Sequence, residues 1–180
     1  MIRSLFRRPA REKGYRVEYE HPTQAIASAF LRSIADDDAA GAFELLSGET
    51  RGMLEGLHAA REMLALHEAA AADGADRLRA VVAPLRDAAL AALGGASRVG
   101  TFGVSAARLV DRRTVYVLLL PEFGEERIVS EADWRPAHLL AFVHESGAPR
   151  GGSSEWLVDL GRTAALSAEA QLPDPLGVIR

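Results

Sequence analysis

The stretch of residues 25–57, AIASAFLRSIADDDAAGAFELLSGETRGMLEGL, decides the fold of this chain. Its first part repeats apolar residues in steps of four, at Ile26, Phe30 and Ile34, and this spacing places their side chains on one face of an α-helix. We therefore predict a helix with Pro22 in its first turn that buries this face against the rest of the molecule.

A run of three carboxylates at residues 36–38 interrupts the apolar spacing. A carboxylate just before Ala39 can accept hydrogen bonds from the free backbone N–H groups of a new helix. We interpret the run as a cap for a short second helix whose inward side is Phe43 and Leu46. A cation site is the less favoured interpretation, because three adjacent side chains do not converge on one ion.

Residues 48–96 are predicted to be helical throughout, in two segments. Pro84 lies within the second segment, where it removes a backbone donor, so we predict a kink or two short helices there. The alanine-rich surface offers small side chains, and we expect this helical hairpin to pack closely or against another subunit. The apolar positions are Met53, Leu57, Ala60 and Leu64 in the first segment and Leu78, Val82, Leu85, Ala89 and Leu93 in the second.

The apolar period changes to two after Ser97, which is typical of β-strands. Residues 98–110 and 114–120 are predicted to form a hairpin, and the second of these runs is apolar on both faces, as expected inside a sheet. Two further alternating runs, 135–145 and 154–160, predict a second hairpin. The sequence therefore predicts an α+β fold with helices first and an antiparallel sheet after them.

Length and composition are those of one folded domain. The 180 residues are 48% hydrophobic and 26% charged, which is enough apolar material for a core. We place the domain at residues 20–165. A basic flexible tail is predicted at residues 1–19, and an extended C-terminal tail at residues 166–180, whose prolines oppose helix formation.

Several classes of function are excluded by composition and spacing. The chain has no cysteine, which excludes disulfides, thiolate zinc sites and a cysteine nucleophile. A net charge of −4 gives no general attraction for nucleic acid. His138 and His144 lie about 20 Å apart along one predicted strand, so they cannot share an ion. We expect no metal site and no cofactor.

The order of elements resembles the nuclear transport factor 2-like superfamily of cone-shaped α+β domains. Residues 25–57, in which the short second helix ends in Leu45-Leu46-Ser47, are similar to the opening helices of that family, and the resemblance extends over residues 21–162. It implies a sheet that curls around the first helix and leaves an apolar pocket at its open end. This chain differs in residues 48–96, where relatives commonly insert a short hairpin.

The resemblance also implies which residues to consider for a site. Members similar to ketosteroid isomerase use a pocket Asp as a proton shuttle, with a Tyr or a protonated acid that stabilises an enolate. In this chain no motif links the candidates. The candidate catalytic residues at strand positions are Tyr116, His138, His144 and Asp159, and the candidate ligand-lining residues are Phe30, Tyr116, Phe142 and Trp156.

Three functions follow as hypotheses. The leading one is a non-enzymatic domain that binds a small apolar molecule or a protein partner, as a homodimer formed through its sheet or its alanine-rich helices. The alternative is an isomerase, dehydratase or cyclase with acid–base chemistry in the cone pocket. The third is an assembly or secretion accessory protein whose basic tail contacts a membrane. No apolar run is long enough for export or a membrane span, which favours a cytoplasmic protein.

Overall fold

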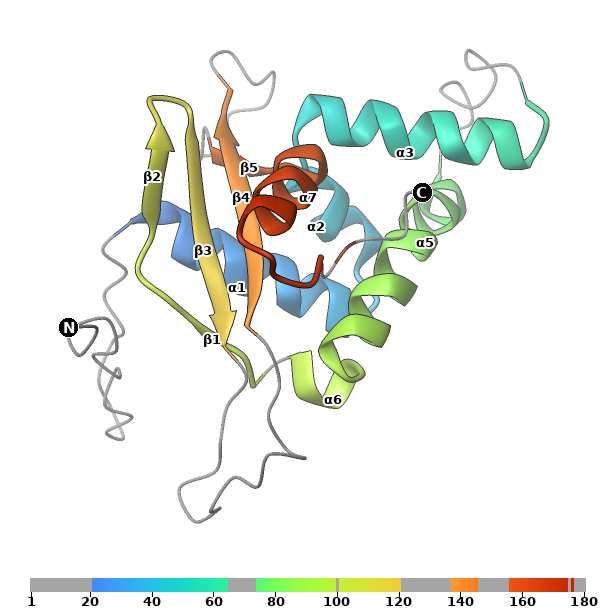
Figure 1. Cartoon of the computed structure of the whole chain (residues 1–180). Coiled ribbons are helices and arrows are strands. Elements are labelled where there is room, and N and C mark those ends of the chain that lie inside the picture. Colours follow the sequence, from blue (N-terminus) through green and yellow to red (C-terminus); the bar gives the residue numbers. More distant parts are fainter. Residues whose placement is uncertain are drawn as a thin grey trace, which may run out of the picture.

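The computed structural model describes residues 21–64, 74–99, 101–120, 137–145, 156–174 and 176. Within these ranges the chain is an α+β fold, as predicted, with six helices and a curled antiparallel sheet that forms a half-barrel (Figure 1). The helices are α1 (Pro22–Ala35), α2 (Ala39–Glu44), α3 (Gly48–Arg61), α5 (Ala75–Leu93), α6 (Ala96–Val99) and α7 (Leu160–Glu169). The strands are β1 (Gly103–Val104), β2 (Arg108–Asp111), β3 (Thr114–Leu120), β4 (His138–His144) and β5 (Trp156–Val158).

Helix α1 crosses the sheet and supplies the centre of the core (Figure 1). Its first turn is fixed by a capping box: the backbone N–H of Thr23 donates to the His21 ring, and the backbone N–H of His21 donates to the Gln24 side chain. Pro22 fits the first helical position because that residue needs no intrahelical donor. The predicted buried face is confirmed, since Ile26, Phe30 and Ile34 are all buried.

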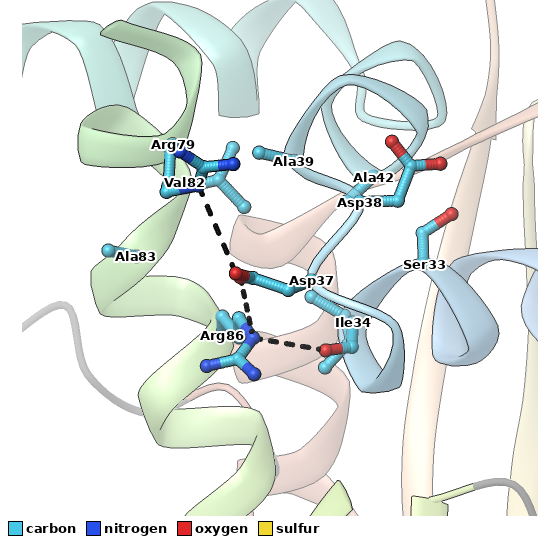
Figure 2. Close-up of a pocket in the computed structure, with 10 residues that line it drawn as sticks. All are labelled: Ser33, Ile34, Asp37, Asp38, Ala39, Ala42, Arg79, Val82, Ala83 and Arg86. Carbon is cyan, nitrogen blue, oxygen red and sulfur yellow. Dashed lines mark hydrogen bonds and ion pairs between the residues drawn. The ribbon is translucent and has the colours of Figure 1, made fainter. Parts of the chain in front are cut away.

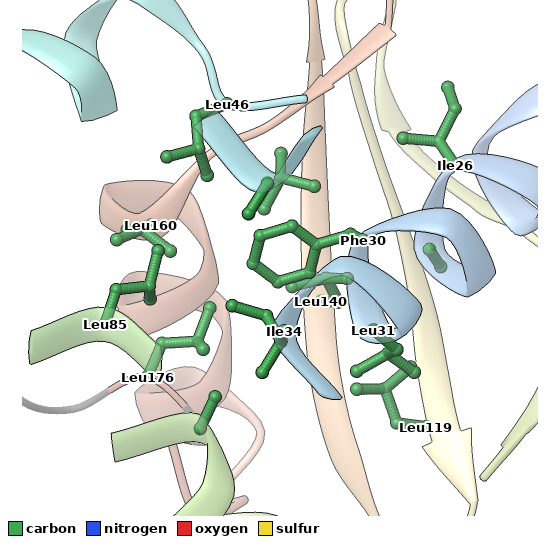
Figure 3. Close-up of a cluster of buried hydrophobic side chains, with 14 of the residues drawn as sticks. Ile26, Phe30, Leu31, Ile34, Leu46, Leu85, Leu119, Leu140, Leu160 and Leu176 are labelled. Atoms are coloured by element: carbon green, nitrogen blue, oxygen red, sulfur yellow. The ribbon is translucent and has the colours of Figure 1, made fainter. Parts of the chain in front are cut away.

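The core joins α1 to both halves of the chain. Figure 3 shows Phe30 and Ile34 of α1 among leucines that come from the sheet and from α5 and α7. Phe30 is 1% exposed and Phe142 of β4 is 0% exposed. Burial of this apolar surface is the main favourable contribution to folding.

Strand β3 lies inside the sheet, as its apolar sequence predicts. The strand order is β1-β3-β4-β5, and β2 pairs with β3 on the same side as β1. The predicted hairpin is confirmed for β2 and β3, with Asp111 paired to Thr114 across its turn. Its predicted first strand over residues 98–110 is wrong in extent, because α6 is helical to Val99 and the rest is divided into β1 and β2. In the ladder with β4, the core-facing pairs are Val115–Phe142, Val117–Leu140 and Leu119–His138.

The second helix is capped as predicted. The backbone N–H of Gly41 donates to the Asp38 side chain (2.9 Å), so Asp38 is the N-cap of α2. No group of acidic and histidine side chains that could hold a metal ion is found in the described residues. Leu46 after this helix is fully buried and Phe43 packs against the core.

Helices α3 and α5 confirm the two predicted helical segments, with two corrections; residues 65–73 of the predicted hairpin lie outside the described residues. The buried residues of α3 are Thr50, Leu54 and Ala59, so its buried face is rotated from the predicted one, and Leu64 lies beyond the helix. Helix α5 is a single helix that includes Pro84, so of the two predicted alternatives, a kink or two short helices, the second is wrong and the kink stays a prediction. Tertiary packing of α5 offsets the missing backbone hydrogen bond.

The last predicted strand is shorter than expected, and a helix replaces its end. Strand β5 stops at Val158 and α7 begins at Leu160, so the predicted strand over residues 154–160 and the start of the extended tail at residue 166 are both corrected. The physical reason is Asp159, whose side chain accepts from the backbone N–H of Arg162 (2.7 Å) and so caps a helix where the alternating pattern suggested more strand.

Two contacts close the sheet on the side of β5. Leu46 forms a parallel bridge with Val158, in which the N–H of Val158 donates to the Leu45 carbonyl and the N–H of Ser47 donates to the Val158 carbonyl, each at 2.8 Å. Where β5 ends, the hydroxyl of Thr163 in α7 accepts from the N–H of Ala141 in β4 (3.0 Å). Backbone groups at this edge are therefore satisfied without another strand.

The chain after α7 returns to the core. Leu172–Asp174 form neither helix nor strand, as predicted for this part of the tail, but the side chain of Leu176 is only 4% exposed and belongs to the core cluster. Figure 3 places it close to Leu85 of α5 and Ile34 of α1. The C-terminal segment is thus part of the folded body.

We expect Leu176→Ala to lower the free energy of unfolding by about 2–5 kcal/mol, because truncation of a buried leucine leaves a cavity. The measurement is urea denaturation followed by circular dichroism. Met63→Ala is the control, since Met63 is 92% exposed and its truncation should change stability by less than about 0.5 kcal/mol. Equal effects of the two substitutions would show that the C-terminal segment does not pack on the core.

Candidate functional site

Asp159, a candidate catalytic residue, lies in a buried polar network that joins two helix N-termini. Its Oδ2 accepts from the hydroxyl of Ser47 (2.7 Å), and Ser47 is the N-cap of α3. The hydroxyls of Ser47 and Thr50 are 2.9 Å apart, and the Thr50 hydroxyl accepts from the N–H of Leu160 (3.0 Å). Thr50 of α3 therefore caps the first turn of α7, and the N-cap residues of the two helices, Ser47 and Asp159, are hydrogen-bonded to each other.

This network fixes Asp159 instead of offering it to a substrate. Both carboxyl oxygens are engaged, Oδ1 with the backbone of Arg162 and Oδ2 with Ser47, and the residue is 3% exposed. Ser47 and Thr50 are 0% and 1% exposed. A general base must reach a proton of the substrate, so this geometry favours a structural role for Asp159.

His138, the second candidate, is buried at the start of β4. It is 6% exposed, and its Nδ1 atom has no hydrogen-bond partner in the described part of the chain. Burial lowers the pKa of His138, while a hydrogen bond to the Pro173 backbone and the nearby carboxylate of Asp174 act to raise it. Phe102 lies beside the imidazole, with 6.2 Å between ring centroids.

His144, the third candidate, lies at the opposite end of β4 from His138. Its ring packs edge-on against Trp156, with 5.0 Å between centroids, and the ring of His21 packs against the same indole at 5.2 Å. Strand register places His144 directly opposite Trp156. The indole that was predicted to line a ligand pocket is thus covered in part by two imidazoles.

The remaining candidates lie on different sides of the sheet. Tyr116 of β3 is half-buried and pairs with Ala141, whereas the neighbouring pair Val117–Leu140 belongs to the core face. Phe30 and Phe142, two of the predicted ligand-lining residues, lie in the packed core. The structure therefore brings Phe30, Phe142 and Trp156 into one apolar cluster but distributes the four catalytic candidates over separate places.

A small hollow lies where α1, α2 and α5 meet (Figure 2). Asp37, which adopts a left-handed backbone conformation with φ of 59°, forms an ion pair with Arg86 (Nε to Oδ1, 3.0 Å) and lies 3.9 Å from Arg79 Nε. The same Arg86 Nε donates to the Ile34 carbonyl (3.2 Å) near the end of α1. The hollow holds about 10 Å³, which is room for a water molecule at most. We interpret it as a helix-terminating ion-pair cluster.

A larger groove lies between α3 and α5, with a volume of about 470 Å³. This volume is within the range of small-molecule sites, roughly 300–1,000 Å³. Leu54 and Val81, each 1% exposed, line it together with half-buried Leu57 and Pro84. The groove is also lined by one polar aromatic ring, one cationic side chain and two carboxylates: His58, Arg61, Glu62 and Asp87.

The ion pair of Glu55 with Arg77 also spans α3 and α5, at 2.6 Å. Glu55 lies one helical turn before His58, and Arg77 lies one turn before Ala80, so the pair follows the groove-lining stripe of each helix. Only 28% of the Glu55 side chain and 16% of the Arg77 side chain are exposed. This contact fixes the spacing of the two helices.

The sequence analysis predicted that Leu57 lies on an apolar helix face and that Pro84 interrupts a helix. It did not predict the groove that both residues line. The signal was present in the composition of α5. The side chains of Ala80, Ala83 and Ala88 on α5 are too small to fill the space between this helix and α3. A gap therefore remains along these alanines.

No protein-family model, no curated protein and no solved structure matches this chain. The fold is compatible with the cone class that the sequence resembles. None of the helices in the described ranges combines the length and the apolar character needed to cross a bilayer. The basic tail at residues 1–19 lies outside the described residues, and the predicted homodimer stays a prediction.

We expect Ser47→Ala to lower the free energy of unfolding by about 1–3 kcal/mol, because it removes a helix cap and leaves the buried Oδ2 of Asp159 without its donor. Chemical denaturation measures the loss. Ser97→Ala is the matched control, since Ser97 is exposed on α6 and should change stability by less than about 0.5 kcal/mol. A Ser47→Ala effect as small as the control would contradict the proposed network.

We expect the free energy of unfolding to fall in mild acid because of the buried imidazole of His138. Its pKa in the folded protein is below the ordinary value of 6.5, so below about pH 6.5 the unfolded chain binds this proton more readily than the folded one. The free energy of unfolding should therefore decrease between pH 7.5 and 5.5, and less steeply in His138→Gln. Ser97→Ala, which removes no titratable group, is the control and should keep the wild-type slope. Identical slopes for wild type and His138→Gln would refute this assignment.

Proposed function

We propose that this protein is a non-enzymatic binding domain of the nuclear transport factor 2-like class, and that it holds a small apolar molecule in the groove between α3 and α5. The observation that carries the proposal is the groove itself, about 470 Å³ with an apolar floor of Leu54, Leu57 and Val81. Apolar concavities of this size with a few polar groups at the rim are the usual form of ligand sites.

The rim disfavours a strongly anionic ligand. Arg61 is the last residue of α3, Glu62 is the C-cap of that helix, and Asp87 contributes a second carboxylate from α5. One arginine beside two carboxylates gives no net attraction for an anion. The binding energy would then come from the apolar surface that the ligand and the groove remove from water.

The placement of the acid–base candidates favours binding over catalysis. Asp159 is used in helix capping, His138 is buried beside the backbone of Pro173, and His144 packs edge-on against Trp156. Proton transfer requires two such groups within reach of one substrate. None of these three residues lines the α3–α5 groove, whose own titratable side chains, His58, Arg61, Glu62 and Asp87, stand at its rim.

The test is binding of the neutral fluorescent probe N-phenyl-1-naphthylamine to the full chain, together with native mass spectrometry of the protein as purified. Ala88→Phe places a ring in the groove and should weaken probe binding at least about tenfold, since it removes the space for the ligand. Ala91→Phe on the same helix is exposed and does not line the groove, so it should bind like wild type.

Two results would contradict the proposal. One is the absence of probe binding to the wild-type protein. The other is equal binding by Ala88→Phe and Ala91→Phe, which would place the site elsewhere, for example in the cone near Phe30. Circular dichroism of both variants verifies that each retains the wild-type helix content.

A further inference from the structure

Pro84 leaves a backbone carbonyl without its helical donor in the wall that α5 contributes to the α3–α5 groove. Proline has no backbone N–H, so Pro84 cannot donate the helical hydrogen bond to the carbonyl of Ala80, four residues earlier. The proline ring also crowds this carbonyl and tilts it away from the helix axis on the side of the ring. Ala80 and Pro84 both line the groove.

A backbone carbonyl that lacks its helical donor must accept a hydrogen bond from another donor. In the free protein water serves this purpose, since Ala80 is exposed; the carbonyl lies in the groove wall beside buried Val81. A ligand that covers the wall displaces water from it. An apolar ligand without a donor would leave the acceptor unsatisfied, which costs free energy.

We infer that the groove selects neutral apolar molecules that carry one hydroxyl or N–H donor, and that the Ala80 carbonyl, released by Pro84, accepts from this donor. The inference rests on the proposed function and names its ligand class. Pro84 is then a specificity-determining residue: its ring contributes apolar surface, and its missing N–H provides the acceptor. The apolar floor and mixed-charge rim set the rest of the preference.

The experiment compares two probes of nearly equal shape, 1-naphthol and 1-methylnaphthalene, by isothermal titration calorimetry on the full chain. Pro84→Ala restores the backbone N–H, which then donates to Ala80 and removes the free acceptor. We expect the affinity ratio of 1-naphthol to 1-methylnaphthalene to fall about fivefold in this variant relative to wild type, the size of one net hydrogen bond.

Pro22→Ala is the matched control. Pro22 is the first residue of α1, where a backbone N–H has no intrahelical acceptor, so the substitution frees no carbonyl and the ratio should stay at its wild-type value. Binding of 1-methylnaphthalene reports whether Pro84→Ala has changed the shape of the groove. Circular dichroism and thermal denaturation report whether each variant is folded.

The outcomes separate this inference from the proposed function. A lower ratio in Pro84→Ala alone supports the role of the Ala80 carbonyl. The inference is overturned if Pro84→Ala keeps the wild-type ratio while both probes bind wild type and bind Ala88→Phe more weakly. The groove would then remain the ligand site. Failure of both probes to bind the wild-type protein overturns the proposed function, and the inference with it.

Discussion

The fold depends on the hydrogen bonds that backbone N–H and C=O groups make at one edge of the sheet. Strand β5 is short, and the chain from Leu45 to Ser47 pairs with Val158 on its outer side. The same residues place Ser47 against Asp159, so the N-termini of α3 and α7 meet at a shared pair of caps. Buried backbone groups and a buried carboxyl both require partners, which makes this junction hard to rearrange.

The consequences of this junction extend in two directions. Helix α3 starts there and runs out over α5, and the ion pair of Glu55 with Arg77 then fixes the separation of the two helices. Helix α7 also starts there and covers the edge of β4, after which Leu176 returns to the core. The groove is thus the space left between two helices whose separation depends on the start of α3 at the junction and on the ion pair of Glu55 with Arg77.

Local patterns were sufficient to predict much of the fold. Steps of four at Ile26, Phe30 and Ile34 identify α1, and the apolar run of β3 identifies an interior strand. Helix α7 was missed because Trp156, Leu157 and Val158 alternate in the strand manner, and the cap formed by Asp159 was not recognised. The site was less predictable, because Asp159 and Ser47 are 112 residues apart and only the folded chain brings them together. The groove depends likewise on the spacing of two helices, which no local pattern encodes.

Hydrogen exchange at the junction tests the account most directly. The N–H groups of Ser47 and Val158 should exchange as slowly as that of Val117 in the centre of the sheet, because all three then open only when the whole domain unfolds. Native-state exchange followed by NMR at increasing urea concentration gives the opening free energy of each amide. Equal values for the three amides are the predicted result. Opening of Ser47 and Val158 at a much lower free energy than Val117 would show that the junction is a loose edge and would contradict its central role.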